Sequence, residues 1–188
     1  MSRRFTSLGD PGFGQLFESF SYTAFRLETL QAYDVTYEGE DFGRFLRGEP
    51  RSESPGIEPW VRQVARGTEI GKRFQRVHVV LEPLTDYIRF ECAWSYRDTV
   101  AAGEDVRIIS ATAESWPDGI PHLDYWLFDS SQLVRMIYNL EGEFTYAELV
   151  DDPAEIMRAN LWRDRAVYLS RPFRQFDDGF DAFMNRDR

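Results

Sequence analysis

The sequence predicts a mixed α/β domain, and three patterns support that prediction. A β-branched run at Phe74–Leu81 leads into an apolar stripe of helical spacing and then into a second strand pattern, which is the order of a βαβ crossover. Three short strand-like runs follow, separated by turn residues, and they predict an antiparallel meander at the end of the sheet. Helical stripes elsewhere supply the layers that pack on the sheet.

Residues 10–56 predict two short helices, a strand and a loop. Asp10-Pro11 is a helix-start signal, and the residues after it have the three-and-four spacing of one helix face: Phe13, Leu16, Phe17 and Phe20. Thr23–Glu28 alternates apolar and polar residues, so we expect a strand that shows one face to solvent. A second short helix is predicted at Asp41–Arg47. Glu49–Gly56 has two prolines and no apolar residue, which predicts an exposed loop.

The middle of the chain predicts the crossover. A helix begins at Glu58-Pro59, where proline suits the first turn. The strand Phe74–Leu81 runs directly into Glu82-Pro83, and this proline is also preorganised for a first helical position. We therefore expect a continuous helix of about five turns over Leu84–Ala101. A strand over Glu104–Ile109 should then lie parallel to the first strand.

The remainder predicts the meander, a helix and a tail. The strand-like runs are Tyr125–Phe128, Leu133–Tyr138 and Phe144–Val150. A helix starting at Asp152-Pro153 carries the apolar stripe Ile156, Ala159, Trp162, Ala166 and Val167. We divide the chain into a single α/β domain over 1–170 and an acidic-aromatic tail over 171–188. We expect the four rings of the tail to fold back on the domain, with docking on another protein as the alternative: Phe173, Phe176, Phe180 and Phe183.

Composition limits the classes of partner. The formal net charge of −10 repels phosphate backbones and anionic lipid, so we expect no direct nucleic-acid partner and no membrane partner. The chain has no run of eighteen apolar residues and no signal-like start, which predicts a cytoplasmic protein. The single cysteine, Cys92, excludes an internal disulfide and is expected to be buried. With only His78 and His122 as histidines, we expect no metal site and no cofactor.

The candidate ligand site is the junction between the first crossover strand and its helix. Open α/β sheets place ligands at the carboxyl ends of parallel strands, and polar residues gather there: Glu82, Thr85, Asp86, Tyr87 and Arg89. Helix capping by the acidic residues is the alternative explanation. Arg76 and His78 share one face of the strand, and His78 is more simply interpreted as a buried, hydrogen-bonded structural residue.

Recognisable catalytic motifs are missing from the sequence. It contains no Gly-x-Ser-x-Gly elbow, no histidine close in sequence to Cys92, and no strand-introduced glycine loop for phosphate. The catalytic residues are therefore unknown, and whether the protein is an enzyme stays open, with the balance against it.

Several segments resemble a family of actinobacterial domains of unknown function, over roughly Phe13–Leu169. They are FQRVHVVLEPLTDYIRFECAWSY, VAAGEDVRII, DYWLFD, LVRMIYN and AELVDDPAEI. This resemblance implies a gene often found beside helix-turn-helix regulators. The layout is also similar to the C-terminal sensor-like domains of such regulators, some of which look like degenerate phospholipase-D-type folds. Working enzymes of that type carry His-x-Lys, but here Val80 follows His78 at the lysine position.

Three functions are compatible with these patterns. We expect a non-catalytic regulatory or sensor-like domain that binds a protein partner or a small polar ligand and works with a helix-turn-helix regulator. The alternative is a small enzyme of secondary metabolism or phosphodiester chemistry that uses an acidic and arginine-containing pocket at the strand–helix junction. A third hypothesis is an antitoxin-like protein whose acidic surface masks a basic partner.

Overall fold

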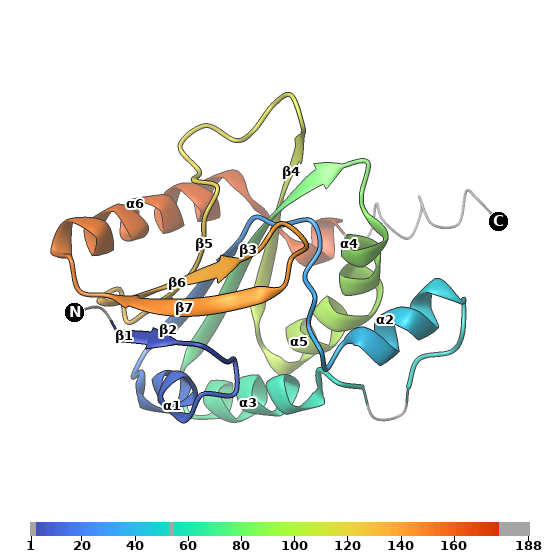
Figure 1. The fold of residues 1–188 in the computed structure, drawn as a ribbon, viewed down its shortest axis with the longest axis horizontal. Coiled ribbons are helices and arrows are strands. Elements are labelled where there is room, and N and C mark those ends of the chain that lie inside the picture. Colours follow the sequence, from blue (N-terminus) through green and yellow to red (C-terminus); the bar gives the residue numbers. More distant parts are fainter. Residues whose placement is uncertain (1–2, 53–54, 177–188) are drawn as a thin grey trace.

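A computed structural model describes residues 3–52 and 55–176, and it shows one mixed sheet with helices on both faces (Figure 1). The described residues form eight strands: β1 (Arg3–Phe5), β2 (Thr23–Glu28), β3 (Arg73–Glu82), β4 (Asp105–Thr112), β5 (Asp124–Phe128), β6 (Gln132–Tyr138), β7 (Phe144–Val150) and β8 (Arg171–Pro172). The α-helices are α1 (Pro11–Ser19), α2 (Gly39–Leu46), α3 (Glu58–Glu69), α4 (Asp86–Phe90), α5 (Tyr96–Ala102) and α6 (Pro153–Leu169).

The strand order is β1-β7-β6-β5-β2-β3-β4-β8. Strands β2, β3 and β4 are parallel, and β5 pairs antiparallel with β2 and continues into the antiparallel meander β5-β6-β7. This confirms the mixed α/β fold, with the predicted crossover and meander. Two short strands complete the edges, because β1 pairs with β7 and β8 pairs with β4. Pairing at both edges leaves fewer unsatisfied backbone groups on the sheet.

The crossover helix is shorter and less regular than the sequence predicts. Its first residue is Asp86, and Pro83 lies before it, because the Thr85 hydroxyl caps the helix by accepting the Ile88 N–H at 3.2 Å. A π-helical segment at Glu91–Ser95 then separates α4 from α5. Such segments are common at functional sites. Here the segment shifts the side chains that follow it relative to a regular helix.

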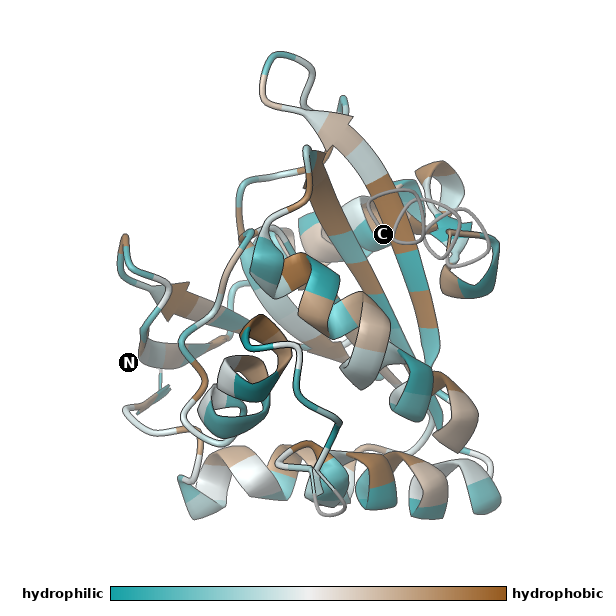
Figure 2. Cartoon of the chain, turned by 90° about the vertical axis from the view of Figure 1, so that its right-hand side faces the viewer, coloured by the Kyte–Doolittle hydropathy of each residue, from teal (hydrophilic) through white to brown (hydrophobic). Residues whose placement is uncertain are grey.

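Each face of the sheet packs on its own set of helices. One face buries residues such as Phe25, Leu27 and Val79 against α6, whose predicted apolar stripe is confirmed. The other face packs against α1 and α3 at one end and against α2, α4 and α5 at the other, through two separate apolar clusters. Alternating brown and teal bands along the strands in Figure 2 follow from the two-residue period of β-structure.

The structure corrects the expectation that β2 shows one face to solvent. This strand lies between β5 and β3, and Arg26 and Glu28 are only 3% and 6% exposed. The alternation of apolar and polar residues is present, but its polar side faces the helices α3 and α5 instead of water. The polar pattern of β2 therefore marks a buried charged layer.

The described part of the C-terminal tail packs on the domain. β8 pairs with β4, and the rings of Phe173 and Phe176 are buried in the cluster around Tyr96. The Phe173 ring lies edge-on to Tyr96, with 5.7 Å between centroids. Phe180 and Phe183 lie outside the described residues.

Candidate functional site

A layer of charged side chains lies on the face of the sheet opposite α6. It separates the two apolar clusters of that face, which pack against α1 and α3 and against α2, α4 and α5. In the register of β2 and β3, Arg26 lies opposite Arg76, and Glu28 lies opposite His78. On the other side of β2, Arg26 lies opposite Trp126 of β5. Burying charges is unfavourable unless each is paired and hydrogen-bonded. The partners of these groups therefore decide what the layer can do.

Asp124 is the acceptor at the β5 side of the layer. Its carboxylate accepts from Arg26 Nη2 at 3.0 Å and from the Tyr33 hydroxyl at 2.5 Å. The backbone N–H and the hydroxyl of Thr29 donate to its other oxygen at 2.8 and 2.7 Å. Arg26 Nη2 also donates to the Tyr138 hydroxyl at 3.0 Å. Asp124 is thus fully engaged and fixes both Arg26 and Tyr33.

Arg76 joins two carboxylates at the centre of the sheet. Its Nη1 donates to both oxygens of Glu28 at 2.8 Å, and its Nε donates to Glu104 at 3.0 Å. The indole N–H of Trp60 donates to the second oxygen of Glu104 at 3.2 Å. Burial acts to raise the pKa of Glu28, but the charges of Arg76 and Arg26 outweigh burial and lower that pKa to about 2.

His78 connects β3 to the π-helical segment. Its Nε2 lies 2.7 Å from the Leu30 carbonyl and therefore carries a proton, and its Nδ1 lies 2.6 Å from the Tyr96 hydroxyl. The Glu91 carboxylate accepts from Tyr96 at 3.0 Å and lies 3.4 Å from Nδ1. Burial acts to lower the pKa of His78, but the hydrogen bond and charge of Glu91 raise it overall. Beside Tyr96 and Glu91, His78 Nδ1 therefore has an increased affinity for a second proton.

Glu38 differs from the other carboxylates of the layer. It precedes α2, is 6% exposed, and accepts a hydrogen bond from the Tyr87 hydroxyl at 2.6 Å. No cation lies within salt-bridge distance of it among the described residues. Burial and then the nearby charge of Glu91 raise the pKa of Glu38 to about 8. Two carboxylates of one layer, Glu28 and Glu38, therefore differ widely in their affinity for protons.

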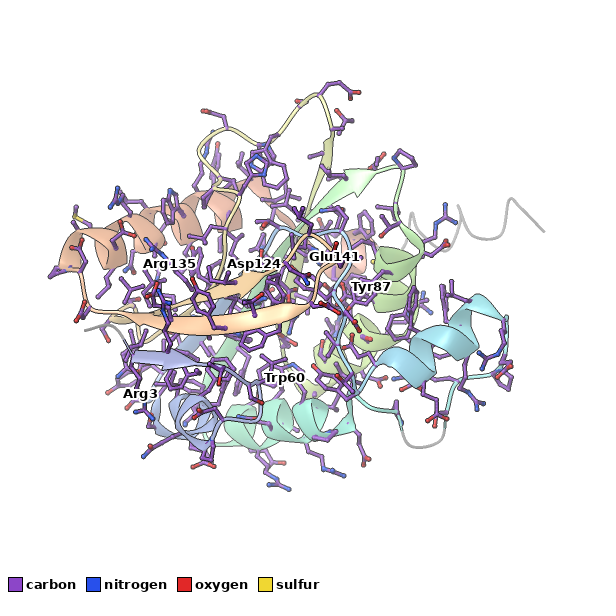
Figure 3. All side chains as sticks on the ribbon, viewed as in Figure 1. Arg3, Trp60, Tyr87, Asp124, Arg135 and Glu141 are labelled. Atoms are coloured by element: carbon purple, nitrogen blue, oxygen red, sulfur yellow. The ribbon has the colours of Figure 1, made fainter. Side chains whose placement is uncertain are left out.

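A cavity of about 900 Å³ opens beside this layer. Its inner half is lined by charged and tyrosine side chains: Arg26, Glu28, Tyr33, Glu38, Arg76, Tyr87, Glu91, Tyr96 and Tyr138. Toward α1 and α3 its lining combines aromatic side chains with polar ones: Phe13, Phe17, Trp60, Phe74 and Trp126, and Glu18, Arg62, Gln63, Arg66 and Lys72. In Figure 3, Trp60 lies on α3, Tyr87 on α4 and Asp124 on the sheet, so the sheet and the helices on one of its faces supply the region.

The structure separates the residues of the predicted site into two groups. Arg76 and Tyr87 line the cavity, and His78 lies directly behind its wall without solvent exposure. Four residues lie outside the lining, at or after the end of β3: Glu82, Thr85, Asp86 and Arg89. Thr85 caps α4 and also donates to the Gln31 carbonyl at 2.6 Å, and Arg89 Nε donates to the Leu84 carbonyl at 3.4 Å. The cluster of polar groups is on the face of the sheet, not at the strand end.

Sequence reasoning missed most of the residues that form the layer: Arg26, Glu28, Tyr33, Glu38, Glu91, Tyr96, Asp124 and Tyr138. One signal was available. Arg26-x-Glu28 and Arg76-x-His78 are charged residues two apart in neighbouring parallel strands, which places all four on one face. The contributions of Glu38 and Glu91 have no such signal, because a loop and a π-helical segment supply them.

Two general features concern the described part of the chain. None of its helices has the length and apolar character needed to cross a bilayer. Across residues 3–52 and 55–176, no group of three or more histidine, cysteine or acidic side chains has the arrangement of a metal site. Cys92 is buried and is not part of a disulfide.

Comparisons with known proteins identify a family and a shared fold. No curated protein matches the chain. Among solved structures, the chain is similar to TrmBL2, described as an archaeal chromatin protein that shows a novel mode of DNA binding, with a TM-score of 0.50 and 6% identity. That alignment covers 92% of this chain and 54% of the other, so the chain spans about half of that protein, and the likeness concerns the fold alone. Residues 11–178 match the family described as Domain of unknown function (DUF6879), and the chain belongs to that family.

Proposed function

We propose that this protein is a non-catalytic, sensor-like regulatory domain that binds a small polar ligand in the cavity beside the charged layer. The observation that carries this proposal is the cavity itself. Its volume of about 900 Å³ is in the range of small-molecule sites. Like such sites, it combines aromatic walls, at Trp60 and Trp126, with a few fixed polar groups, at Arg76 and Glu38.

The energetic cost of the charged layer also supports a binding role. Buried ion pairs commonly stabilise a fold no better than apolar residues of similar size. A sheet that needed only stability would extend its apolar clusters across the positions of Arg26 and Arg76. Buried groups with strongly shifted pKa values, such as Glu28 and Glu38, are concentrated at functional sites in proteins.

We further propose that the output of this domain passes to a protein partner, with a cytoplasmic helix-turn-helix regulator as the candidate. A net charge of −10 disfavours direct contact with phosphate backbones. Any link to DNA would therefore depend on the partner, whereas the chromatin protein of similar fold is itself described with a mode of DNA binding. Co-purification of the tagged protein with a regulator encoded beside it tests this part. Recovery of no regulator, or direct binding of the isolated protein to duplex DNA, would contradict it.

Thermal unfolding with a chemically diverse panel tests the ligand-binding proposal. A ligand that binds only the folded state raises the unfolding temperature in a concentration-dependent way. Gly14 on α1 lines the cavity, and a Cβ added there has no other atom within 4 Å, so Gly14→Phe should narrow the cavity with little strain at the backbone. Its exposed neighbour Gln15 does not line the cavity, which makes Gln15→Phe the matched control.

The expected result is stabilisation by at least one class of small polar compound, weakened in Gly14→Phe and kept in Gln15→Phe. If no compound shifts unfolding, or if both variants respond like the natural sequence, the cavity is not the binding site. Turnover of a nucleotide, phosphodiester or ester substrate by the purified protein would instead favour an enzyme.

A further inference from the structure

The carboxylates of the charged layer outnumber its guanidinium groups. Arg26 contacts Asp124 and Glu28, and Arg76 contacts Glu28 and Glu104, so two cations face three anions. The His78–Glu91 pair is at best neutral. The layer therefore has a surplus of negative charge before Glu38 is considered.

Glu38 has an unused oxygen at the cavity. Its Oε2 accepts from Tyr87, but its Oε1 has no hydrogen-bond partner among the described residues. Oε1 is not fully enclosed by protein atoms, unlike the unpartnered Arg26 Nη1 among the described residues. Glu38 is only 6% exposed and is one of the residues that line the cavity. A hydrogen-bond donor on a ligand would complete this carboxylate.

Aromatic rings surround the same end of the cavity. The Tyr33 ring lies 6.0 Å from the Tyr87 ring and 5.1 Å from the Tyr138 ring, centroid to centroid. All three residues line the cavity. The faces of such rings attract organic cations, and this attraction increases in sites shielded from water.

Building on the function proposed above, we propose that the inner end of this cavity binds the ammonium group of a small organic amine, between the Glu38 carboxylate and the rings of Tyr33 and Tyr87. The aromatic side chains of the lining toward α1 and α3, such as Trp60 and Trp126, would hold the apolar part of the same ligand. An anionic ligand fits less well at this inner end, because the carboxylates of the layer there outnumber its guanidinium groups.

The protonation of Glu38 gives this inference a distinctive consequence. Groups from four elements face Glu38: Tyr87 from α4, Glu91 from the π-helical segment, Arg76 from β3 and Glu28 from β2. With a pKa raised to about 8 by burial and by Glu91, Glu38 is mostly protonated at pH 7. A bound ammonium favours the carboxylate, so binding at pH 7 should release close to one proton.

Isothermal titration calorimetry with three probes of one shape tests the inference: benzylamine, benzyl alcohol and benzoate. We expect benzylamine to bind at least about tenfold more tightly than benzyl alcohol, with benzoate weakest. Repeating the benzylamine titration at pH 7 in buffers of different ionisation enthalpy should show proton release. Glu38→Gln, which keeps an acceptor for Tyr87, should remove both the preference and the proton release. Glu69→Gln, an exposed change outside the cavity lining, should keep both.

The outcomes separate this inference from the proposed function. If benzyl alcohol or benzoate binds as tightly as benzylamine, or if benzylamine does not bind, the amine inference is wrong. The cavity can still be a ligand site in that case, provided that the thermal panel yields a neutral or anionic ligand. If Glu38→Gln fails to fold, the probe comparison and the buffer series on the natural sequence still decide the matter.

Discussion

Replacing Glu38 by glutamine should remove much of the loss of stability that this protein shows as pH rises. The pKa of Glu38 is about 8 in the folded protein, against 4.5 as its ordinary value, with burial as the main cause and Glu91 as the second. Because its pKa is higher in the folded state, Glu38 binds its proton more tightly there than in the unfolded chain. The stability that this proton contributes is therefore fully present below pH 4.5 and is lost as pH rises toward 8.

The size of the effect follows from the same interval. At about 1.4 kcal/mol for each pH unit, the change between pH 5 and pH 9 amounts to about 2 to 4 kcal/mol of unfolding free energy. Glutamine does not titrate, so Glu38→Gln should lack this part of the pH dependence of the unfolding free energy. Some dependence will remain, because the raised pKa of His78, set by Glu91 against the effect of burial, also removes stability as pH rises.

Urea unfolding of the natural sequence, Glu38→Gln and Glu69→Gln at pH 5, 7 and 9 measures this difference. Between pH 5 and pH 8 the stability of Glu69→Gln should fall more steeply than that of Glu38→Gln, which leaves Glu38→Gln the more stable of the two at pH 9. A natural sequence whose stability is flat across this range would refute the reasoning. So would a Glu38→Gln variant that keeps the whole slope.

Three further results are expected. Asp124→Ala should cost about 3 to 5 kcal/mol in urea unfolding, because it leaves buried Arg26 without its main acceptor, and a cost below about 1 kcal/mol would contradict the network. Arg76 and Arg26 lower the pKa of Glu28 to about 2 against the effect of burial, so the ionised Glu28 should stabilise the fold above pH 4.5, and this stabilisation should be lost as pH falls toward 2. Acid unfolding followed by circular dichroism checks this. Native structure retained unchanged at pH 2 would count against it. Phe173→Ala should cost about 3 to 5 kcal/mol because its ring is buried against the domain, and a neutral result would place the tail elsewhere.

The sequence predicted the parts of the fold that depend on local patterns. The strand–helix–strand order from Phe74 to Ile109 appears as β3, the interrupted helix and β4, and the three runs after Tyr125 appear as β5, β6 and β7. These elements have clear hydrophobic periods and turn residues at their ends. The edge strands β1 and β8 were not predicted, because two or three residues carry no period, and their pairing depends on the rest of the sheet.

The candidate site could be predicted only in part. Arg76, His78 and Tyr87 were identified, but the strand end was expected to hold the ligand, whereas the cavity lies on the face of the sheet. Arg26 and Glu28 were interpreted as surface residues because charges are seldom buried. Their burial depends on partners such as Asp124, 98 residues from Arg26, which no local pattern can indicate.

A crystal structure of the protein with benzylamine tests the central claim most directly. The account predicts the amine nitrogen within about 3 Å of the Glu38 carboxylate, with the ring extending toward Trp60 and the Arg76–Glu28 pair intact. A cavity that stays free of the amine at saturating concentration, or one in which the amine nitrogen points away from Glu38, would contradict it.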